Sequence, residues 1–161
     1  MNFMDKTESK KGAFGESLVD DILENRFSIY TPKDHDSPHP IDRLMVDKNT
    51  HEVFGLDVKS KSKRKLHDDT GIDMRHYKTY FDINKTLKVF LIFVDEDNQK
   101  IYGNKLDNLL LDKARKEYGI VYFKISDMKH LGDISDEDAA TLRSLTTKQD
   151  KYKPDEEMIE L

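Results

Sequence analysis

The stretch that decides the fold is EVFGLDVKS, residues 52–60, in which an apolar run ends in Asp57-Val58-Lys59. Its apolar, β-branched and aromatic residues predict a buried strand. Side chains alternate between the two faces of a strand, so Asp57 and Lys59 are expected on one face of the sheet. The sequence therefore predicts a carboxylate and an amine side by side at the end of a strand.

The residues before this stretch supply a partner strand. Residues 41–47 have strand character, and the polar KNTH segment that follows them is typical of a turn. A hairpin centred within this turn places Leu44 near position 55 and Asp42 opposite Asp57. Directly opposed residues have Cβ atoms about 4.5–5.5 Å apart, so the two carboxylates would be neighbours. A bulge or a one-residue slip would break this match.

Composition predicts one domain with a small core and a densely charged surface. The chain has 161 residues, of which 36% are hydrophobic and 37% charged, and a chain of this length is expected to form a single domain. Cysteine is absent, which excludes disulfides and thiolate metal sites and fits a reducing compartment. No apolar run approaches the length of a membrane span, about 20 residues. Residues 1–11 lack the apolar segment of a secretion signal, so we expect a cytoplasmic protein that makes no membrane contact.

Positive charge is concentrated at the end of the Asp57-Val58-Lys59 tripeptide and directly after it. The net charge is −5, yet residues 59–65, KSKSKRK, are mostly Lys and Arg. A local basic patch can hold phosphate groups despite an acidic total charge. The alternative is a solvated loop, as for many lysine-rich segments. The position beside an acidic pair favours phosphate contacts at Lys61, Lys63, Arg64 and Lys65, with Arg43 expected nearby across the hairpin.

The whole sequence predicts an α/β fold with a mixed central β-sheet flanked by helices. Residues 87–94 are the most apolar stretch and predict a central strand covered on both faces. We expect helices over 12–26, 73–85, 105–117, 126–131 and 135–144, further strands over 27–31, 100–102 and 119–125, and a turn over 68–71. Residues 1–11 are expected to be a flexible N-terminus, 12–145 a single domain and 146–161 a charged C-terminal tail.

In this order of elements and in its acidic residues, the chain resembles the PD-(D/E)XK nuclease superfamily over about residues 12–102. The resemblance implies a restriction-endonuclease-like fold with an αβββαβ core. Asp42 falls on the first acidic position of the family pattern, and Asp57-Val58-Lys59 falls on its (D/E)XK tripeptide. Glu16, in Gly15-Glu16, matches the acidic residue that several branches place in the first helix. The leading Pro-Asp of the family appears here as Pro40-Ile41-Asp42, with the proline displaced by one residue.

The resemblance also implies a metal site and roles for its residues. Asp42 and Asp57 would bind Mg²⁺ or Mn²⁺, with the main-chain carbonyl of Val58 as a further ligand. Lys59 would either orient or deprotonate the attacking water or offset charge in the transition state, and the sequence leaves both roles open. Glu16 would bind a second metal or a metal-bound water, or else it is an exposed helix glutamate.

The activity implied is metal-dependent hydrolysis of nucleic acid, with a DNA endonuclease favoured and a homodimer expected where two strands are cut. Tyr77, on the aromatic side of the second helix, could stack on a base or belong to the core. The alternatives are a non-catalytic nucleic-acid-binding or assembly protein on the same fold and an acidic interaction protein. Asp42, Asp57 and Lys59 together argue against a binding role, because two carboxylates would repel phosphates in the absence of a metal.

Overall fold

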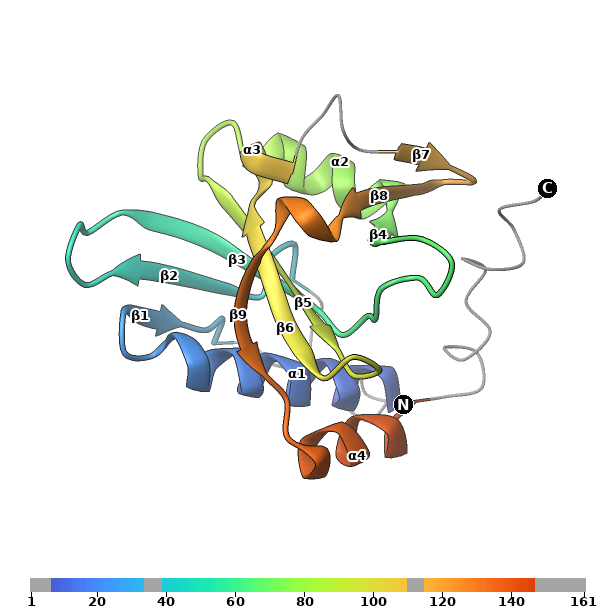
Figure 1. Ribbon diagram of the computed structural model, residues 1–161. Helices are drawn as coiled ribbons and strands as arrows, with labels where there is room; N and C mark the ends of the chain where they lie inside the picture. The colour runs from blue at the N-terminus through green and yellow to red at the C-terminus, as the bar shows by residue number, and fades with distance from the viewer. Residues whose placement is uncertain (1–6, 34–38, 110–114, 147–161) are drawn as a thin grey trace.

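The fold is built around a six-stranded mixed sheet with the strand order β1-β2-β3-β5-β6-β9 (Figure 1). The computed structural model describes residues 7–33, 39–109 and 115–146. Adjacent strands are antiparallel except β3 and β5, whose parallel pairing requires a crossover connection. The strands are β1 (Phe27–Tyr30), β2 (Arg43–Asp47), β3 (Val53–Lys59), β5 (Val89–Asp95), β6 (Lys100–Lys105) and β9 (Lys129–Asp133).

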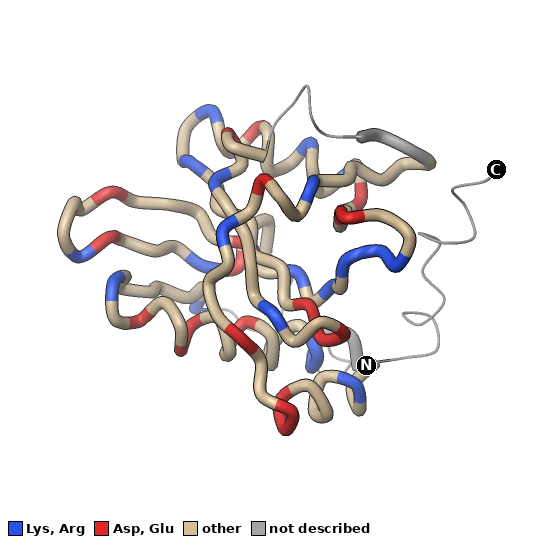
Figure 2. The backbone as a smooth tube through the Cα atoms, viewed as in Figure 1, with Lys and Arg blue, Asp and Glu red and all other residues tan. Residues whose placement is uncertain are grey.

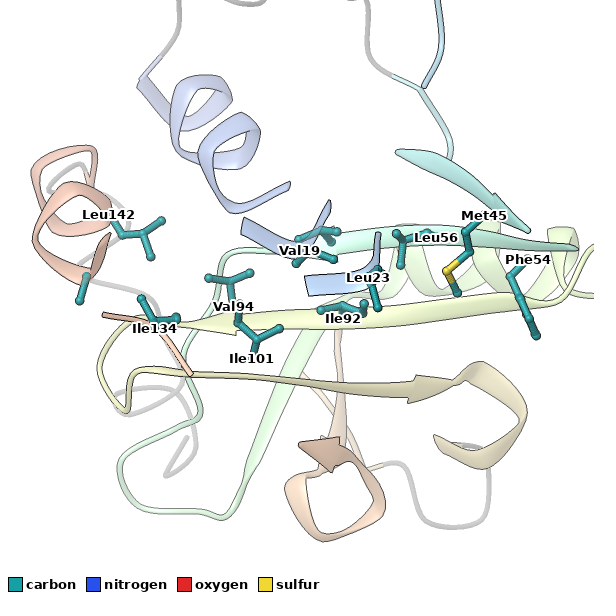
Figure 3. Packing of buried hydrophobic residues seen from close by; sticks show 12 residues of the cluster. Val19, Leu23, Met45, Phe54, Leu56, Ile92, Val94, Ile101, Ile134 and Leu142 are labelled. Atoms are coloured by element: carbon teal, nitrogen blue, oxygen red, sulfur yellow. The ribbon is translucent and has the colours of Figure 1, made fainter. Parts of the chain in front are cut away.

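One face of this sheet is covered by α1 (Thr7–Leu23), with α4 (Asp136–Ser144) packed beside it (Figure 1). Val19 and Leu23 lie one helical turn apart on α1, and both are buried against the sheet. Figure 3 shows them among the buried side chains that include Leu56 of β3 and Ile92 of β5. Burial of a large apolar side chain contributes about 1.5–3 kcal/mol, which holds the helix on the sheet.

The other face carries α2 (Met74–Ile83), which lies on the crossover between β3 and β5. Asp73 caps this helix by accepting a hydrogen bond from the backbone N–H of Arg75 (2.8 Å). Tyr77 and Tyr80 are the buried residues of α2 and belong to a second core with Leu91 of β5. Next to α2 lie the short helix α3 (Leu106–Leu109) and a three-stranded sheet in the order β4 (Asp69–Asp73), β8 (Ile120–Lys124) and β7 (Arg115–Glu117).

The predicted fold class is confirmed. A mixed central sheet is flanked by helices, and α1, β1, β2, β3, α2 and β5 follow one another in the order of an αβββαβ core, with β4 inserted before α2. The central strand β5 is buried along nearly its whole length, as its apolar run predicts. The predicted strands over 27–31, 41–47, 52–60, 87–94, 100–102 and 119–125 and the helices over 73–85 and 135–144 are present, with somewhat different ends.

Two predicted elements are wrong because long-range strand pairing overrides local signals. Residues 68–71 are predicted as a turn, yet β4 begins at Asp69 and pairs with β8. Gly71 suits this strand because a Cβ at this position would collide with the ring of Tyr122. Residues 126–131 are predicted as a helix, but a short 3₁₀ turn, Ile125–Asp127, leads into β9. Strand β9 pairs with β6 at the edge of the main sheet, so its context decides its structure.

Two predicted boundaries also need correction. The helix predicted over 105–117 ends at Leu109 as α3, and residues 115–117 form β7, while 110–114 lie outside the described residues. Helix α1 spans Thr7–Leu23 rather than 12–26, so part of the predicted flexible N-terminus is helical. Residues 1–6 and the predicted tail over 147–161 lie outside the described ranges, and the division into three regions stays a prediction.

No helix within the described ranges is both long and apolar enough to cross a membrane.

Candidate active site

The β2–β3 hairpin brings Asp42 to the Asp57-Val58-Lys59 tripeptide. Its register is the predicted one, with Leu44 opposite Gly55. Asp42 lies one residue before β2, and its carboxylate oxygen Oδ2 accepts a hydrogen bond from the backbone N–H of Val58 (2.8 Å). The side chain of Asp42 is thereby fixed to the backbone between Asp57 and Lys59.

Asp57 and Lys59 project from the same face of β3, as strand alternation predicts. Lys59 Nζ lies 3.3 Å from Asp57 Oδ2, and only 3% of Asp57 is exposed. Burial raises the pKa of Asp57, the nearby charge of Asp42 raises it further, and the Lys59 ammonium opposes both effects. Two neighbouring carboxylates in a poorly solvated place carry negative charge that a bound cation would relieve.

Helix α2 adds two side chains to this arrangement, Tyr80 and His76, which lie one turn apart. The Tyr80 hydroxyl donates a hydrogen bond to Oδ2 of Asp57. Lys59 Nζ lies 5.4 Å from the centroid of the Tyr80 ring and 3.3 Å from Nδ1 of His76. Burial raises the pKa of Tyr80, with the charge of Asp57 as the next cause, so the hydroxyl keeps the proton that it donates. Lys59 is thus held between β3 and α2.

The sequence analysis does not identify His76 as a site residue, and it does not predict that Tyr80 binds Asp57. A signal that could have found them is their spacing, because two ring side chains with polar tips stand four positions apart in the predicted helix that follows the tripeptide. Residues four apart lie on one face of a helix. Both rings would therefore point to the same neighbour once the helix was placed over the end of β3.

Each of the two aspartates keeps one carboxylate oxygen without a hydrogen-bond donor. Oδ2 of Asp42 is bound by Val58 and Oδ2 of Asp57 by Tyr80 and Lys59, whereas no residue in the described ranges donates to either Oδ1. Mg²⁺ is commonly held by one or two protein carboxylates, with water and phosphate oxygens completing its shell. The two Oδ1 atoms of Asp42 and Asp57 are ligands of the kind that such a cation binds. Within the same ranges, no three His, Asp or Glu side chains come together as a metal site.

Glu16 lies close to this pair, but its direct partner is Arg43. Glu16 Oε1 is 2.6 Å from Arg43 Nη1, and Asp20 Oδ2 is 3.4 Å from Arg43 Nε. Burial raises the pKa of Glu16 to about 7, with the charge of Asp42 as the next cause and Arg43 opposing both. The charge of Asp42 therefore acts on Glu16, while the carboxylate of Glu16 is paired with the guanidinium of Arg43.

The basic segment that follows β3 is anchored by backbone and buried contacts. The Lys63 N–H donates to Asp95 Oδ2 (3.2 Å), and Arg64 forms a two-point ion pair with Asp69 (2.6 and 2.7 Å). The Arg64 guanidinium also lies over the Tyr122 ring, 3.7 Å from its centroid. Figure 2 shows the segment as a run of positive charge along the chain. Of its lysines, Lys65 is exposed, and Lys61 and Lys63 are half-buried.

Three of the residues predicted to contact nucleic acid have partners within the protein. Arg64 is only 1% exposed and is paired with Asp69, so it stabilises the fold instead of offering its charge to solvent. Tyr77 is 5% exposed and stacks on Phe123, so its ring belongs to the core. Arg43 neutralises acidic side chains of α1. The contacts at Lys61, Lys63 and Lys65 stay predictions.

Fold and site together define an α/β domain whose central sheet presents an aspartate pair and a lysine at the end of a hairpin. No family model matches the chain, and no curated protein matches it. Among solved structures, the chain is similar to Hjc, a Holliday junction resolvase of the hyperthermophilic archaeon Archaeoglobus fulgidus. The TM-score is 0.47 and the identity 10%, with 70% of this chain and 88% of that chain covered. The strand order, the strand pairing and the flanking helices described above define the fold.

Proposed function

We propose that this protein is a metal-dependent nuclease that hydrolyses phosphodiester bonds in nucleic acid, with internal cleavage of DNA as the expected reaction. The observation that carries the proposal is the buried Asp57, with Asp42 beside it and Lys59 at 3.3 Å. A buried carboxylate next to a second one is unfavourable unless a cation compensates the charge. An ion pair that only stabilised the fold would need one carboxylate for Lys59, so the second carboxylate supports a catalytic site.

The oxygens available to a divalent cation are Oδ1 of Asp42 and Oδ1 of Asp57, with the main-chain carbonyl of Val58 as the next candidate. When bound, Mg²⁺ or Mn²⁺ would supply Lewis-acid activation of a phosphate and of a water molecule. The protein holds the two carboxylates in place. The Val58 N–H fixes Asp42, and the Tyr80 hydroxyl fixes Asp57.

Lys59 is the residue proposed to act on the attacking water or on the charge of the transition state. Its contacts with Asp57, His76 and the Tyr80 ring fix Nζ before any substrate binds. As an ammonium, Nζ would donate hydrogen bonds to phosphate oxygens that gain negative charge during the reaction. As a neutral amine, it would instead accept a proton from water. The two roles differ in which protonation state of Lys59 is active.

Glu16 is proposed to act from the edge of the site. With a pKa of about 7, its carboxyl group can hold or release a proton close to neutral pH. Arg43 orients the carboxylate through the 2.6 Å contact. If a cation replaced Arg43 as its partner, Glu16 would become a further carboxylate ligand.

Nucleic acid is proposed to reach the site along the basic segment. Lys61, Lys63 and Lys65 follow the catalytic lysine directly, and the Asp95 and Asp69 contacts keep their backbone in place. Contacts of this kind hold phosphates without reading base sequence. A homodimer would provide a second site for cleavage of the opposite strand.

The experiment that tests the proposal is a matrix of substrates and metals. The protein is incubated with supercoiled, linear, single-stranded and branched DNA and with RNA, each in Mg²⁺, Mn²⁺ or chelator. We expect cleavage in metal and none in chelator, with nicked or linear product from supercoiled DNA. Asp57→Asn should abolish cleavage, whereas Asp133→Asn, at an exposed aspartate of β9, should leave it unchanged.

Two results would contradict the nuclease proposal. One is the absence of metal-dependent cleavage on every substrate, and binding of these substrates without cleavage would then support the non-catalytic alternative. The other is cleavage that survives in both Asp57→Asn and Lys59→Ala, because it would come from a different site.

A further inference from the structure

Tyr118 lies at the tip of the β7–β8 hairpin in a backbone conformation that is unfavourable for tyrosine. Glu117 pairs with Ile120, so Tyr118 and Gly119 form a two-residue turn. Their φ angles are +51° and +76°. Hairpin turns with two positive φ angles favour Asn-Gly, because a positive φ strains residues with a large side chain. Asparagine at position 118 would therefore be lower in energy than tyrosine.

The Tyr118 ring does not offset this strain by burial. The residue is 50% exposed, and its side chain makes no hydrogen bond or ring contact with any residue in the described ranges. A tyrosine in a core would contribute buried apolar area and a paired hydroxyl. A strained backbone that presents an exposed aromatic ring is instead an observation that supports a binding role.

The turn is attached to the helix that contacts Lys59. The Gly119 carbonyl accepts a hydrogen bond from the N–H of Met74 (2.8 Å), the first residue of α2. Two residues further along α2, His76 Nδ1 lies 3.3 Å from Lys59 Nζ. Figure 1 shows the hairpin formed by β7 and β8 in the small sheet next to α2. Tyr118 and the candidate active site are therefore joined through the first turn of one helix.

Basic side chains accompany Tyr118 at this end of α2. The side chain of Arg75 is 85% exposed although it pairs with Asp73, and Lys78 is exposed three residues further on. Proteins that bind single-stranded nucleic acid combine aromatic rings, on which bases stack, with cations that follow the phosphates. A base inside a continuous duplex has both faces covered by its neighbours, so stacking on a side chain requires an unpaired base.

We propose that Tyr118 stacks on an unpaired base of the substrate near the phosphate that is cleaved. This inference rests on the proposed nuclease function and narrows its substrate class. The substrate is single-stranded DNA, or a branched or flapped DNA with unpaired bases, in preference to a blunt duplex.

The test measures binding separately from cleavage, in an Asp57→Asn background. The probes are a fluorescent single-stranded oligonucleotide that contains 2-aminopurine and a blunt duplex of the same sequence. Tyr118→Asn should weaken binding of the single strand by about tenfold and reduce the fluorescence change, with binding of the duplex unaltered. Its thermal midpoint should equal or exceed that of the parent, because asparagine suits the positive φ. Tyr118→Phe should keep the affinity for the single strand.

Tyr30 provides the matched control, since it is a tyrosine of β1 that is 58% exposed. Tyr30→Asn should bind both probes like the parent. The inference would be overturned if Tyr118→Asn bound the single strand as tightly as the parent does. It would also be overturned if Tyr118→Asn lost the same factor in affinity for the single strand and for the duplex. Cleavage by the otherwise wild-type protein is followed in parallel. If the wild-type protein cleaves DNA and Tyr118→Asn binds the single strand as tightly as the parent, only the stacking role is overturned. If Tyr118→Asn weakens binding of the single strand but the wild-type protein cleaves no substrate, only the nuclease proposal is overturned.

Discussion

The hydroxyl of Tyr80 donates a hydrogen bond to Oδ2 of Asp57, so a helix residue fixes the carboxylate at the end of β3. Lys59 lies 3.3 Å from the same oxygen. Protein groups therefore occupy Oδ2, while Oδ1 receives no donor from the described residues. This division of the two oxygens is what a carboxylate needs if it is to be held by the protein and still bind a cation.

Tyr80→Phe should alter the pH dependence of cleavage. The variant keeps the ring over Lys59 but loses the hydrogen bond, and that bond lowers the pKa of Asp57 by favouring its charged form. Its loss should raise the pKa, so the ionised carboxylate would be reached only at higher pH. We expect the acidic limb of the rate profile to move to higher pH and the free energy of unfolding to fall by about 1–3 kcal/mol.

Tyr102→Phe is the matched control for this prediction. The Tyr102 hydroxyl donates to Oδ2 of the buried Asp95 (2.7 Å), outside the candidate active site. The control should lose stability in the same way and keep the wild-type rate profile. An identical profile in Tyr80→Phe and wild type would contradict the role given to Tyr80.

Divalent cations should stabilise the folded protein. A ligand that binds only the native state at 100 times its Kd adds about 2.7 kcal/mol, and for a chain of this size each 1 kcal/mol corresponds to about 2–4 °C in the thermal midpoint. We expect Mg²⁺ or Mn²⁺ to raise the thermal midpoint of unfolding, and chelator to bring it back to the value of the metal-free protein. Asp42→Asn should reduce the rise strongly, whereas Asp133→Asn should not. A rise that is equal in wild type and Asp42→Asn would place the cation elsewhere.

In chelator, Asp57→Asn should stabilise the protein at neutral and higher pH. Burial and Asp42 raise the folded-state pKa of Asp57, so the native state binds this proton more tightly than the unfolded state. Stability is therefore lost as pH rises from the unfolded pKa, about 3.9, through the folded value. Asparagine carries no charge and avoids this loss. Urea unfolding should show the variant to be more stable than wild type at about pH 8 and closer to it at about pH 4. The opposite order at high pH would refute the prediction.

Two glycines of α1 should respond in opposite ways to alanine. A Cβ at Gly15 would overlap Oγ of Ser60, the residue directly after β3, whereas a Cβ at Gly12 would meet nothing within 4 Å. Gly12→Ala should add about 0.5–1 kcal/mol to the free energy of unfolding, because alanine favours the helix. Gly15→Ala should lose about 1–3 kcal/mol, because the Ser60 side chain must give way to the new methyl group. Much of this loss should return in Gly15→Ala with Ser60→Ala, and a failure to recover would mean that another contact limits the approach.

Much of the candidate site could be predicted because it depends on short-range rules. Strand alternation puts Asp57 and Lys59 on one face, and the turn fixes the register that brings Asp42 to the tripeptide. Both rules act within one hairpin. The contribution of α2 could not be predicted in the same way, because the contacts of Tyr80 and His76 depend on how the helix crosses the sheet.

Other features of the chain depend on partners that are far apart in the sequence. Arg64 belongs to a basic run, yet the pairing of β4 with β8 places Asp69 and the Tyr122 ring around it. Residues 126–131 are wrongly predicted as a helix because the pairing of β9 with β6 joins segments that are far apart in the chain. Such partners are invisible to local patterns, and they decide whether a charged side chain is buried or exposed.

The most direct test of the proposed catalytic site is the rate of a single round of cleavage by Lys59→Met in Mg²⁺, compared with wild type and with Lys129→Met at an exposed lysine of β9. A positioned acid, base or charged group typically contributes about 10²–10⁴-fold to the rate. We expect the cleavage rate of Lys59→Met to fall by that factor while the variant stays folded and still binds substrate, and the rate of Lys129→Met to be unaffected. The thermal midpoint of Lys59→Met should fall, because the variant leaves Asp57 without its ion-pair partner. Wild-type rates in folded Lys59→Met would contradict the catalytic site.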